Sequence, residues 1–216
     1  MFVKGLVVGP VETNCYILGD EATKDAALID PGDSGLRMVT QAREAGYQVK
    51  MILLTHGHFD HIGGVKDALS ALKAEDPTRD IPVYIHHADY PMAPASFFRP
   101  VTLEGVEGVR FYDEGDTVTL GGHTIRVLST PGHTQGGVCL MVEDCLFTGD
   151  TLFAGACGRA DFETSSTADM MASLKRLGQL EGDYKVYPGH EEATLLSVER
   201  QENPYLIYAM RNAHIF

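Results

Sequence analysis

Cysteine is scarce in this sequence, and no two cysteines form a Cys-x-x-Cys pair. The 216 residues include four of them, and Cys139 and Cys145 fall in apolar segments where small core residues are expected. A chain of this length that is 44% hydrophobic can bury a sizeable core without a disulfide framework. We therefore expect a protein of the reducing cytoplasm.

Basic residues and long apolar runs are also lacking. Lys and Arg total 17 against 30 Asp and Glu, and the resulting net charge of −13 disfavours a general nucleic-acid or anionic-membrane surface. No apolar run is long enough to span a bilayer, and the start of the chain lacks the basic and apolar regions of a signal peptide. A small anionic substrate remains compatible, because a metal site can be locally positive on an acidic protein.

Strand patterns and helix patterns alternate along the chain, and no linker, low-complexity tract or charge run divides it. Apolar runs bounded by turn residues predict strands at residues 2–8, 14–18, 26–29, 51–54, 82–85, 117–120, 124–128, 137–142, 145–148 and 185–187. Helices are predicted at residues 36–45, 65–74, 168–177, 191–200 and 204–212. The N-cap is expected to be Ser34 for the first helix, and Ser166 or Thr167 for the third. We therefore expect one α/β domain over residues 1–216, with a two-sheet core and helices outside.

Residues 90–110 have a weaker pattern than the rest of the chain. Prolines and glycines make this segment irregular, and no regular element is predicted in it. It could be a lid over a site, or a surface loop with no role in chemistry.

The stretch from Thr55 to His61, Thr-His-Gly-His-Phe-Asp-His, concentrates polar side chains. It directly follows the apolar run 51–54, which predicts a short buried strand. Three histidines and one aspartate within six positions would repel one another or stay unsatisfied there without a metal ion. Because sites on α/β sheets form in loops at the carboxyl ends of strands, we predict that this loop binds metal.

Three further ligand-type side chains each come just after a predicted strand. They are His133, Asp150 and His190, and glycine directly precedes each one, which lets the backbone turn sharply. A single histidine after a glycine is usually a surface or capping residue, but the repeated pattern indicates strand ends that converge on one edge. The remaining histidines lack this context, and we expect solvent or core roles for them: His86, His87, His123 and His214.

The His-x-His-x-Asp-His run at 56–61, with the three downstream residues in that order, resembles the metallo-β-lactamase superfamily. The resemblance covers nearly the whole chain, including Asp30 at the end of an early strand, and the seven-residue set is highly specific. It implies a four-layer αββα sandwich with a dinuclear metal site at one edge of the two sheets. It also implies that Asp60 and Asp150 are catalytic. The implied ligands are His56, His58 and His133 for one metal and Asp60, His61 and His190 for the other, with Asp150 bridging them.

The donor types fit this chemistry. All seven are nitrogen or oxygen donors, which suit two divalent zinc ions and also iron or manganese. Two adjacent dications can share one water and lower its pKa toward neutrality, which supplies hydroxide at pH 7. A metal ion can also polarise a carbonyl and accept the developing negative charge. Neither step needs a serine or cysteine nucleophile, so we expect a metal-dependent hydrolase.

Segment 148–159 is similar to glyoxalase II and its relatives, which hydrolyse the thioester hydroxyacylglutathione. A thiolate leaving group of modest pKa needs little help from a general acid. The chain lacks the longer C-terminal helical region that contributes to glutathione binding in the classical enzyme, so it is closer to the short, single-domain bacterial type. The secreted β-lactamase branch typically has cysteine in place of Asp150 and no histidine in place of His61. Nuclease branches carry an inserted domain or an RNA-binding arm that is not evident here.

The run from Cys157 to Phe162, Cys-Gly-Arg-Ala-Asp-Phe, also resembles persulfide dioxygenases. That resemblance implies one Fe(II), held by His56, His133 and Asp150, which oxidises glutathione persulfide with O2. The three would form a facial set of two histidines and one carboxylate. The identity of the metal separates the two enzymatic readings. A non-catalytic metal-binding protein is a third alternative, which a degenerate ligand set would favour and this complete set does not.

Two residues near the end of this segment are candidates for substrate contact. Arg159 could hold a substrate carboxylate in two-point geometry, or it could form a structural salt bridge. Cys157 could be an exposed thiol near the site, or a packed small residue. We expect the substrate to be a small molecule, such as a glutathione thioester, and expect neither nucleic acid nor membrane as a partner.

Overall fold

Strand β2 (Thr13–Gly19) shows how alternating side chains build the layers of this fold. Tyr16 and Leu18 point into the core between the two sheets, whereas Cys15 and Ile17 point to the opposite face, beneath helices. Neighbouring side chains of a strand point to opposite faces, so one apolar strand can serve two cores at once. The computed structural model describes residues 1–90, 101–162 and 164–211.

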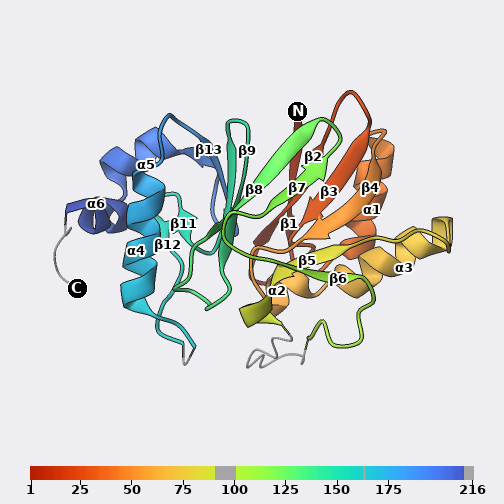
Figure 1. Ribbon diagram of the computed structural model, residues 1–216, viewed down its shortest axis with the longest axis horizontal. Helices are drawn as coiled ribbons and strands as arrows, with labels where there is room; N and C mark the ends of the chain where they lie inside the picture. Colours follow the sequence, from red (N-terminus) through yellow and green to blue (C-terminus); the bar gives the residue numbers. More distant parts are fainter. Residues whose placement is uncertain (91–100, 163, 212–216) are drawn as a thin grey trace.

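The first sheet contains the strands of the N-terminal half (Figure 1). Its spatial order is the same as its chain order, antiparallel from β1 to β3 and parallel from β3 to β6. Besides β2, its strands are β1 (Phe2–Val8), β3 (Asp25–Ile29), β4 (Gln48–Leu53), β5 (Val83–His86) and β6 (Val109–Tyr112).

The second sheet is formed by the C-terminal half. Its order is β14-β13-β10-β9-β8-β7, and β10 and β13 run parallel. These strands are β7 (Thr117–Leu120), β8 (His123–Ser129), β9 (Val138–Val142), β10 (Cys145–Gly149), β13 (Lys185–Pro188) and β14 (Thr194–Leu195). A separate two-stranded ribbon joins β11 (Leu152–Phe153) to β12 (Ala156–Cys157).

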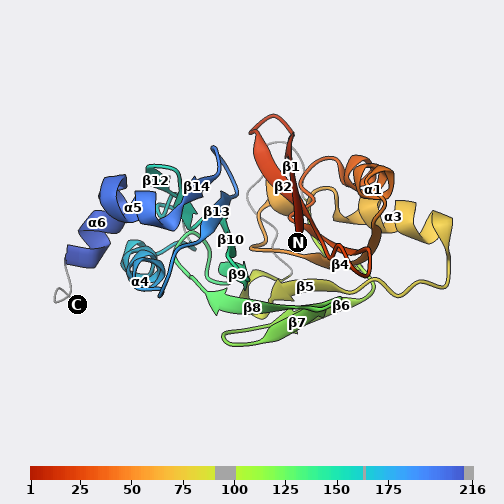
Figure 2. The same ribbon diagram turned by 90° about the horizontal axis from the view of Figure 1, so that it is seen from above.

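Helices cover the outer face of each sheet, which gives the αββα sandwich (Figures 1 and 2). The first sheet is covered by α1 (Gly35–Glu44) and α3 (Val65–Glu75), whose apolar residues recur every three or four positions. Short helix α2 (Phe59–Ile62) precedes α3, and a 3-10 turn (His87–Asp89) follows β5. The second sheet is covered by α4 (Thr167–Gly178), α5 (Leu196–Glu202) and α6 (Pro204–Arg211).

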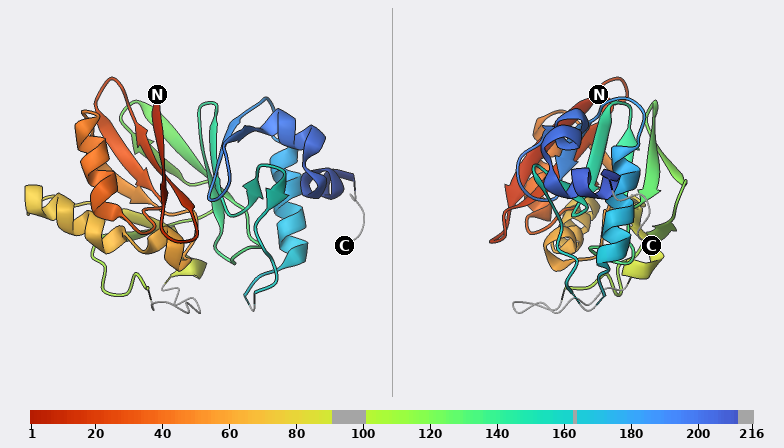
Figure 3. Two further views of the ribbon diagram at one scale, coloured as in Figure 1. Left: turned by 180° about the vertical axis from the view of Figure 1, so that it is seen from behind. Right: turned by 90° about the vertical axis from the view of Figure 1, so that its left-hand side faces the viewer.

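The two helical layers lie on opposite sides of the molecule in the rear view (Figure 3, left). Between the sheets, Tyr16 packs edge-on against Phe147 with ring centroids 5.3 Å apart, and Leu53 and Leu140 belong to the same buried cluster. Cys139 and Cys145 are buried, as expected for core residues, and the four cysteines, all within the described part of the chain, are free thiols. None of the helices in the described residues has the length and apolarity needed to cross a membrane.

The predicted helix at 191–200 is wrong in its first part. Glu191 has a φ of 66°, and Thr194 pairs with Val186 as strand β14, so the helix begins only at Leu196. A residue in a right-handed helix has a negative φ, so Glu191 in its left-handed conformation cannot belong to the helix. Ser34 occupies the N-cap of α1 without a side-chain cap bond, whereas the Ser166 hydroxyl accepts from the Asp169 amide.

Several short elements were not predicted from the sequence: α2, β6, β11, β12 and β14. Strand β6 begins at the end of the segment 90–110 and continues past it to Tyr112, and its four residues pair with β5 in parallel. Residues 91–100 of the segment interpreted as a lid or a surface loop, and residue 212 at the end of the last predicted helix, lie outside the described residues.

Candidate metal centre

Strand ends from both sheets meet at one edge of the sandwich. The loop after β4 brings residues 55–58, α2 brings Asp60 and His61, and the turns after β8, β10 and β13 bring the downstream residues. A hydrogen bond connects the two sheets at this edge: the Val138 amide donates to the Thr55 carbonyl at 2.9 Å. Gly149, directly before Asp150, has a φ of 47°, and a side chain there would overlap Thr55.

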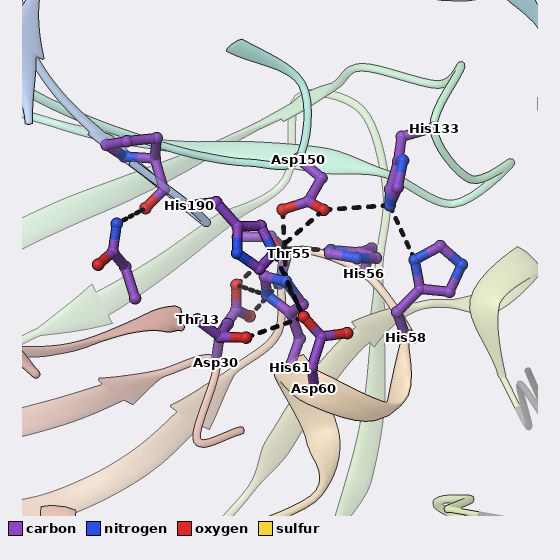
Figure 4. A network of polar contacts seen from close by, with 12 residues as sticks. Thr13, Asp30, Thr55, His56, His58, Asp60, His61, His133, Asp150 and His190 are labelled. Atoms are coloured by element: carbon purple, nitrogen blue, oxygen red, sulfur yellow. Dashed lines mark hydrogen bonds and ion pairs between the residues drawn. The ribbon is translucent and has the colours of Figure 1, made fainter. Parts of the chain in front are cut away.

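Seven side chains converge at this edge, and we call them the metal-facing cluster (Figure 4). Asp150 lies in the middle: one carboxylate oxygen is 3.3 Å from His61 Nε2, and the other is 3.2 Å from His133 Nε2. The predicted site residues are therefore adjacent in space, although the sequence separates the first and the last by more than a hundred positions. The members are His56, His58, Asp60, His61, His133, Asp150 and His190.

Six of the seven members form two groups, and within each group the donor atoms lie within 4.8 Å of one another; His56 and His61 also form such a group with Asp30. The three-histidine set contains His56, His58 and His133, and His58 Nδ1 is 2.8 Å from His133 Nε2. The mixed set contains Asp60, His61 and His190. Within the mixed set, Asp60 Oδ2 lies 3.3 Å from Nε2 of both histidines.

Hydrogen bonds on the outer nitrogens orient three of the rings. His56 Nδ1 contacts the Thr55 hydroxyl at 3.1 Å, and His61 Nδ1 lies 2.9 Å from an Asp30 carboxylate oxygen. His133 Nδ1 donates to the Arg159 carbonyl at 2.7 Å. Because the outer nitrogen of each ring is engaged, the Nε2 atom faces the centre of the cluster, as metal-binding histidines require.

Unpartnered atoms test whether this cluster fits metal ions. His56 Nε2, His61 Nε2 and Asp150 Oδ1 are buried and have no hydrogen-bond partner within residues 1–90, 101–162 and 164–211. Buried polar atoms without partners cost free energy, and all three face the same small volume. The donors are imidazole nitrogens and carboxylate oxygens, the ligands of zinc and iron sites, so the residues fit divalent transition-metal ions.

Burial and neighbouring charges lower the pKa of two histidines in the cluster and raise the pKa of a third. Burial, together with the nearby His61, holds the pKa of His56 well below its ordinary value, and burial lowers the pKa of His58 to about 4. Burial also opposes charge on His61, but the carboxylates of Asp150 and Asp30 raise its pKa well above the ordinary value. His56 and His58 are therefore neutral at pH 7 and can bind metal without first losing a proton.

The two carboxylates of the cluster are ionised at neutral pH. Burial opposes the charge of Asp60, but neighbouring His190 and His61 outweigh it and hold its pKa far below the ordinary value. The same balance, dominated by His61 after burial, lowers the pKa of Asp150. Both carboxylates can therefore act as metal ligands without first losing a proton.

Asp30, Thr13 and Asp89 support the cluster from outside. Asp30 accepts from the Thr55 amide and hydroxyl, and the Thr13 hydroxyl donates to Asp60 Oδ2 at 2.9 Å. Asp89 accepts from two backbone amides that lie in loops of the cluster. Of these three residues, only Asp30 is marked in the sequence, because it stands at the end of a strand and directly before a turn. The sequence does not mark Thr13 or Asp89 in this way.

Arg159 lies at the rim of the site and its side chain is 69% exposed. The guanidinium makes a two-point ion pair with Asp161 at 2.9 and 3.0 Å and stacks 4.7 Å from the Phe162 ring centroid. The Phe162 ring in turn lies edge-on to His58 and His133, with centroids 5.6 Å away. A charged and aromatic rim thus borders the three-histidine set.

Cys157 and the remaining histidines lie elsewhere. Cys157 is half-buried in β12 and packs against the core beneath α4, and burial raises its thiol pKa to about 11. His86 and His87 stand near Asp113, and His123 contacts Asp20 and Glu143. His214 lies outside the described residues.

The sequence profile of the Metallo-beta-lactamase superfamily matches residues 8–190. An uncharacterized protein of Mycobacterium leprae is 36% identical over 95% of this chain and 99% of its own length. The probable polyketide biosynthesis zinc-dependent hydrolase BaeB of Bacillus velezensis is 34% identical, over 82% of this chain and 72% of its own. The hydroxyacylglutathione hydrolase GloC of Haemophilus influenzae is 29% identical, over 95% and 98%.

Solved structures with the same fold cover nearly the whole chain. The B3 metallo-β-lactamase BLEG-1 matches with a TM-score of 0.81 at 31% identity, over 95% of this chain and 99% of that one. TTHA1623 in a di-iron-bound form matches with a TM-score of 0.79 at 33% identity, over 94% of this chain and 99% of that one. ETHE1 from Myxococcus xanthus matches with a TM-score of 0.73 at 27% identity, over 100% of this chain and 92% of that one. The matched profile spans every member of the metal-facing cluster. The chain therefore belongs to the metallo-β-lactamase superfamily of metal-dependent hydrolases.

Proposed function

We propose that this protein is a dinuclear metallo-hydrolase of thioesters, of the hydroxyacylglutathione type or a related one. The single observation that carries the proposal is the position of Asp150, whose two carboxylate oxygens face the mixed set and the three-histidine set. The relatives support the reaction class, since GloC is named for hydroxyacylglutathione hydrolysis and BaeB for zinc-dependent hydrolysis.

In this proposal each set would hold one divalent ion, and Asp150, with one carboxylate oxygen toward each set, would be a ligand common to both. Metal ions bound there supply a hydroxide at neutral pH and a positive charge for the developing oxyanion. Asp30 holds the ring of His61, and Thr13 holds the carboxylate of Asp60 through its hydroxyl. Asp60, which stays ionised because of His190 and His61, acts as a ligand and orients the attacking water by accepting a hydrogen bond.

The rim favours an anionic small molecule over a large partner. Arg159 is exposed, and its backbone carbonyl accepts from His133 Nδ1, so its positive charge lies on a residue that contacts the three-histidine set. A guanidinium can exchange its Asp161 partner for a substrate carboxylate in the same two-point geometry. A thioester fits the site because its thiolate leaves without a strong general acid.

Persulfide dioxygenase activity is the second candidate. It is favoured by the Cys157–Phe162 run, and the di-iron-bound form of TTHA1623, a structural relative, supports iron as the metal but not a count of one. That activity would need one Fe(II) held by His56, His133 and Asp150, a facial set of two histidines and one carboxylate. The two candidates therefore differ in metal identity and in metal count.

Metal analysis with paired assays on the freshly purified protein tests the proposal. Two zinc-type ions per chain with hydrolysis of S-D-lactoylglutathione are expected, and a chelator should abolish the hydrolysis until zinc is restored. One iron per chain with O2 uptake on glutathione persulfide would replace the main proposal by the second. A β-lactam assay serves as the control for the reaction named in BLEG-1, and β-lactam cleavage without thioester cleavage would overturn the substrate class.

A further inference from the structure

Asp89 is a buried carboxylate held by backbone amides. It ends the 3-10 turn after β5, is 1% exposed, and accepts from the Gly57 amide at 2.9 Å and from the Gly136 amide at 2.7 Å. Each carboxylate oxygen serves one amide. In the described part of the chain no basic side chain lies within salt-bridge distance of it, so the two amides carry the whole interaction.

The two amides belong to loops that carry the three-histidine set. Gly57 stands between His56 and His58 in the loop after β4, which belongs to the first sheet. Gly136 comes three residues after His133 in the loop before β9, which belongs to the second sheet. Asp89 therefore connects a loop of the first sheet to a loop of the second sheet, and these two loops carry all three histidines of the set.

Close packing shows that this connection is tight. A side chain at Gly136 would come within 2.6 Å of Asp89 Oδ1 and 2.9 Å of its amide nitrogen, so the loop approaches Asp89 as only glycine can. The carboxylate also accepts through charge-assisted bonds, which are shorter and stronger than neutral ones. A shift of either loop would break one of the two bonds and change the distance between His58 and His133.

The mixed set has different supports. Asp60 is held by the Thr13 hydroxyl and His61 by Asp30, and the described structure gives Asp89 no hydrogen bond or ion pair to either of these supports. His190 follows β13, on another strand of the second sheet. Asp89 therefore supports only loops of the three-histidine set, whereas Asp30 reaches both sets, His61 directly and His56 through the Thr55 hydroxyl.

We propose that Asp89 is a positioning residue that sets the spacing of His56, His58 and His133, and so selectively controls the affinity of the three-histidine set for a divalent transition-metal ion. The proposal rests on the two-ion centre of the proposed function, but not on its substrate. Outer hydrogen bonds of this kind typically change metal affinity by about 10- to 100-fold. Removal of Asp89 should therefore weaken one binding constant and leave the other.

The test is a zinc titration of metal-free full-length protein against a competing chelator, in backgrounds that each keep one set. In His190→Ala protein, which retains the three-histidine set, Asp89→Ala should weaken zinc binding by about 10- to 100-fold. In His58→Ala protein, which retains the mixed set, the same change should leave zinc affinity within about twofold. Thr13→Val, the matched control, should weaken binding only in the His58→Ala background.

Asp89→Asn is the conservative variant that separates positioning from folding. Asparagine keeps one acceptor oxygen and turns an amide group toward the second N–H, so an intermediate loss of affinity is expected. Equal weakening in both backgrounds, accompanied by a lower melting temperature of the metal-free protein, would show a general structural role and overturn the proposal. Unchanged affinity in both backgrounds would overturn it too. Failure of the proposed function appears separately, as absent thioester hydrolysis in wild-type protein that still binds two ions.

Discussion

Asp30 Oδ2 lies 2.9 Å from His61 Nδ1, and both side chains are almost fully buried. The same carboxylate oxygen accepts from the Thr55 hydroxyl at 2.6 Å, and the other oxygen accepts from the Thr55 amide at 2.7 Å. One aspartate at the end of β3 therefore fixes both a ring of the mixed set and the start of the loop after β4.

Asp30→Asn should weaken metal binding by about 10- to 100-fold, because an amide cannot accept from both Thr55 and His61 as the carboxylate does. Zinc affinity measured by chelator competition checks this. Asp33→Asn, in the same turn but outside the cluster, is the control and should leave the affinity unchanged. Unchanged zinc affinity in Asp30→Asn would contradict the orienting role of Asp30.

Asp150→Ala should reduce the metal content and remove thioester hydrolysis. The carboxylate faces His61 with one oxygen and His133 with the other, so its loss takes a donor from both sets. Because the loss of a direct ligand exceeds that of an outer hydrogen bond, the activity should fall by more than about 100-fold. Metal analysis and the S-D-lactoylglutathione assay measure the two effects. Retention of two tightly bound ions would rule out a shared ligand at this position.

The members of the metal-facing cluster are predictable from the sequence, because each follows an apolar strand and a glycine or lies in the compact 56–61 run. Parallel neighbours such as β10 and β13 end at the same edge, which turns a repeated sequence pattern into a spatial cluster. Strands β1 to β5 of the first sheet are likewise visible as apolar runs, whereas β6 was not predicted.

The supports of the cluster are not predictable in the same way. Asp89 is bonded to Gly57 and Gly136, which are 32 and 47 positions away, and its partners are backbone amides that have no residue signature. Thr13 reaches Asp60 across 47 positions. The register of β14 likewise depends on the positive φ of Glu191, a conformation that is uncommon outside glycine. Such contacts exist only after the sheets have packed.

Arg159→Ala should raise KM for an anionic thioester by about tenfold and leave kcat nearly unchanged, since a charge-assisted contact to the remote end of a substrate is lost. The side chain is exposed, and exposed ion pairs contribute little to folding, so the melting temperature should stay within about 2 °C. Steady-state kinetics and a thermal melt measure both.

Asp161→Asn is the matched variant for Arg159, because it frees the guanidinium from its two-point partner. KM should stay the same or fall in this protein. Kinetics that are unchanged in Arg159→Ala would assign the arginine to its ion pair with Asp161 alone.

The Glu114–Arg176 pair links helix α4 to the turn between β6 and β7, and both residues also bond the backbone of Ser129 at the end of β8. The two terminal guanidinium nitrogens donate to Glu114, one of them at 2.7 Å, and the Ser129 amide donates to the same carboxylate at 2.8 Å. The hydrogen bond from Arg176 lowers the pKa of Glu114 below its ordinary value. A lowered folded-state pKa means that the stabilisation is present above the unfolded-state pKa and is lost as pH falls through the folded-state value.

Glu114→Gln should therefore lower the free energy of unfolding at pH 7 by about 0.2–1 kcal/mol, a small value because the pair is half exposed and screened by solvent. The difference from wild type should shrink as the pH is lowered from 7 through the folded-state pKa of Glu114, where the wild-type carboxylate also takes up a proton. Urea unfolding of metal-free protein at several pH values measures this, since bound metal would add its own proton competition. In an Arg176→Ala background the same substitution should have a much smaller effect at every pH. A difference that grows on acidification would contradict the sign of the Glu114 shift.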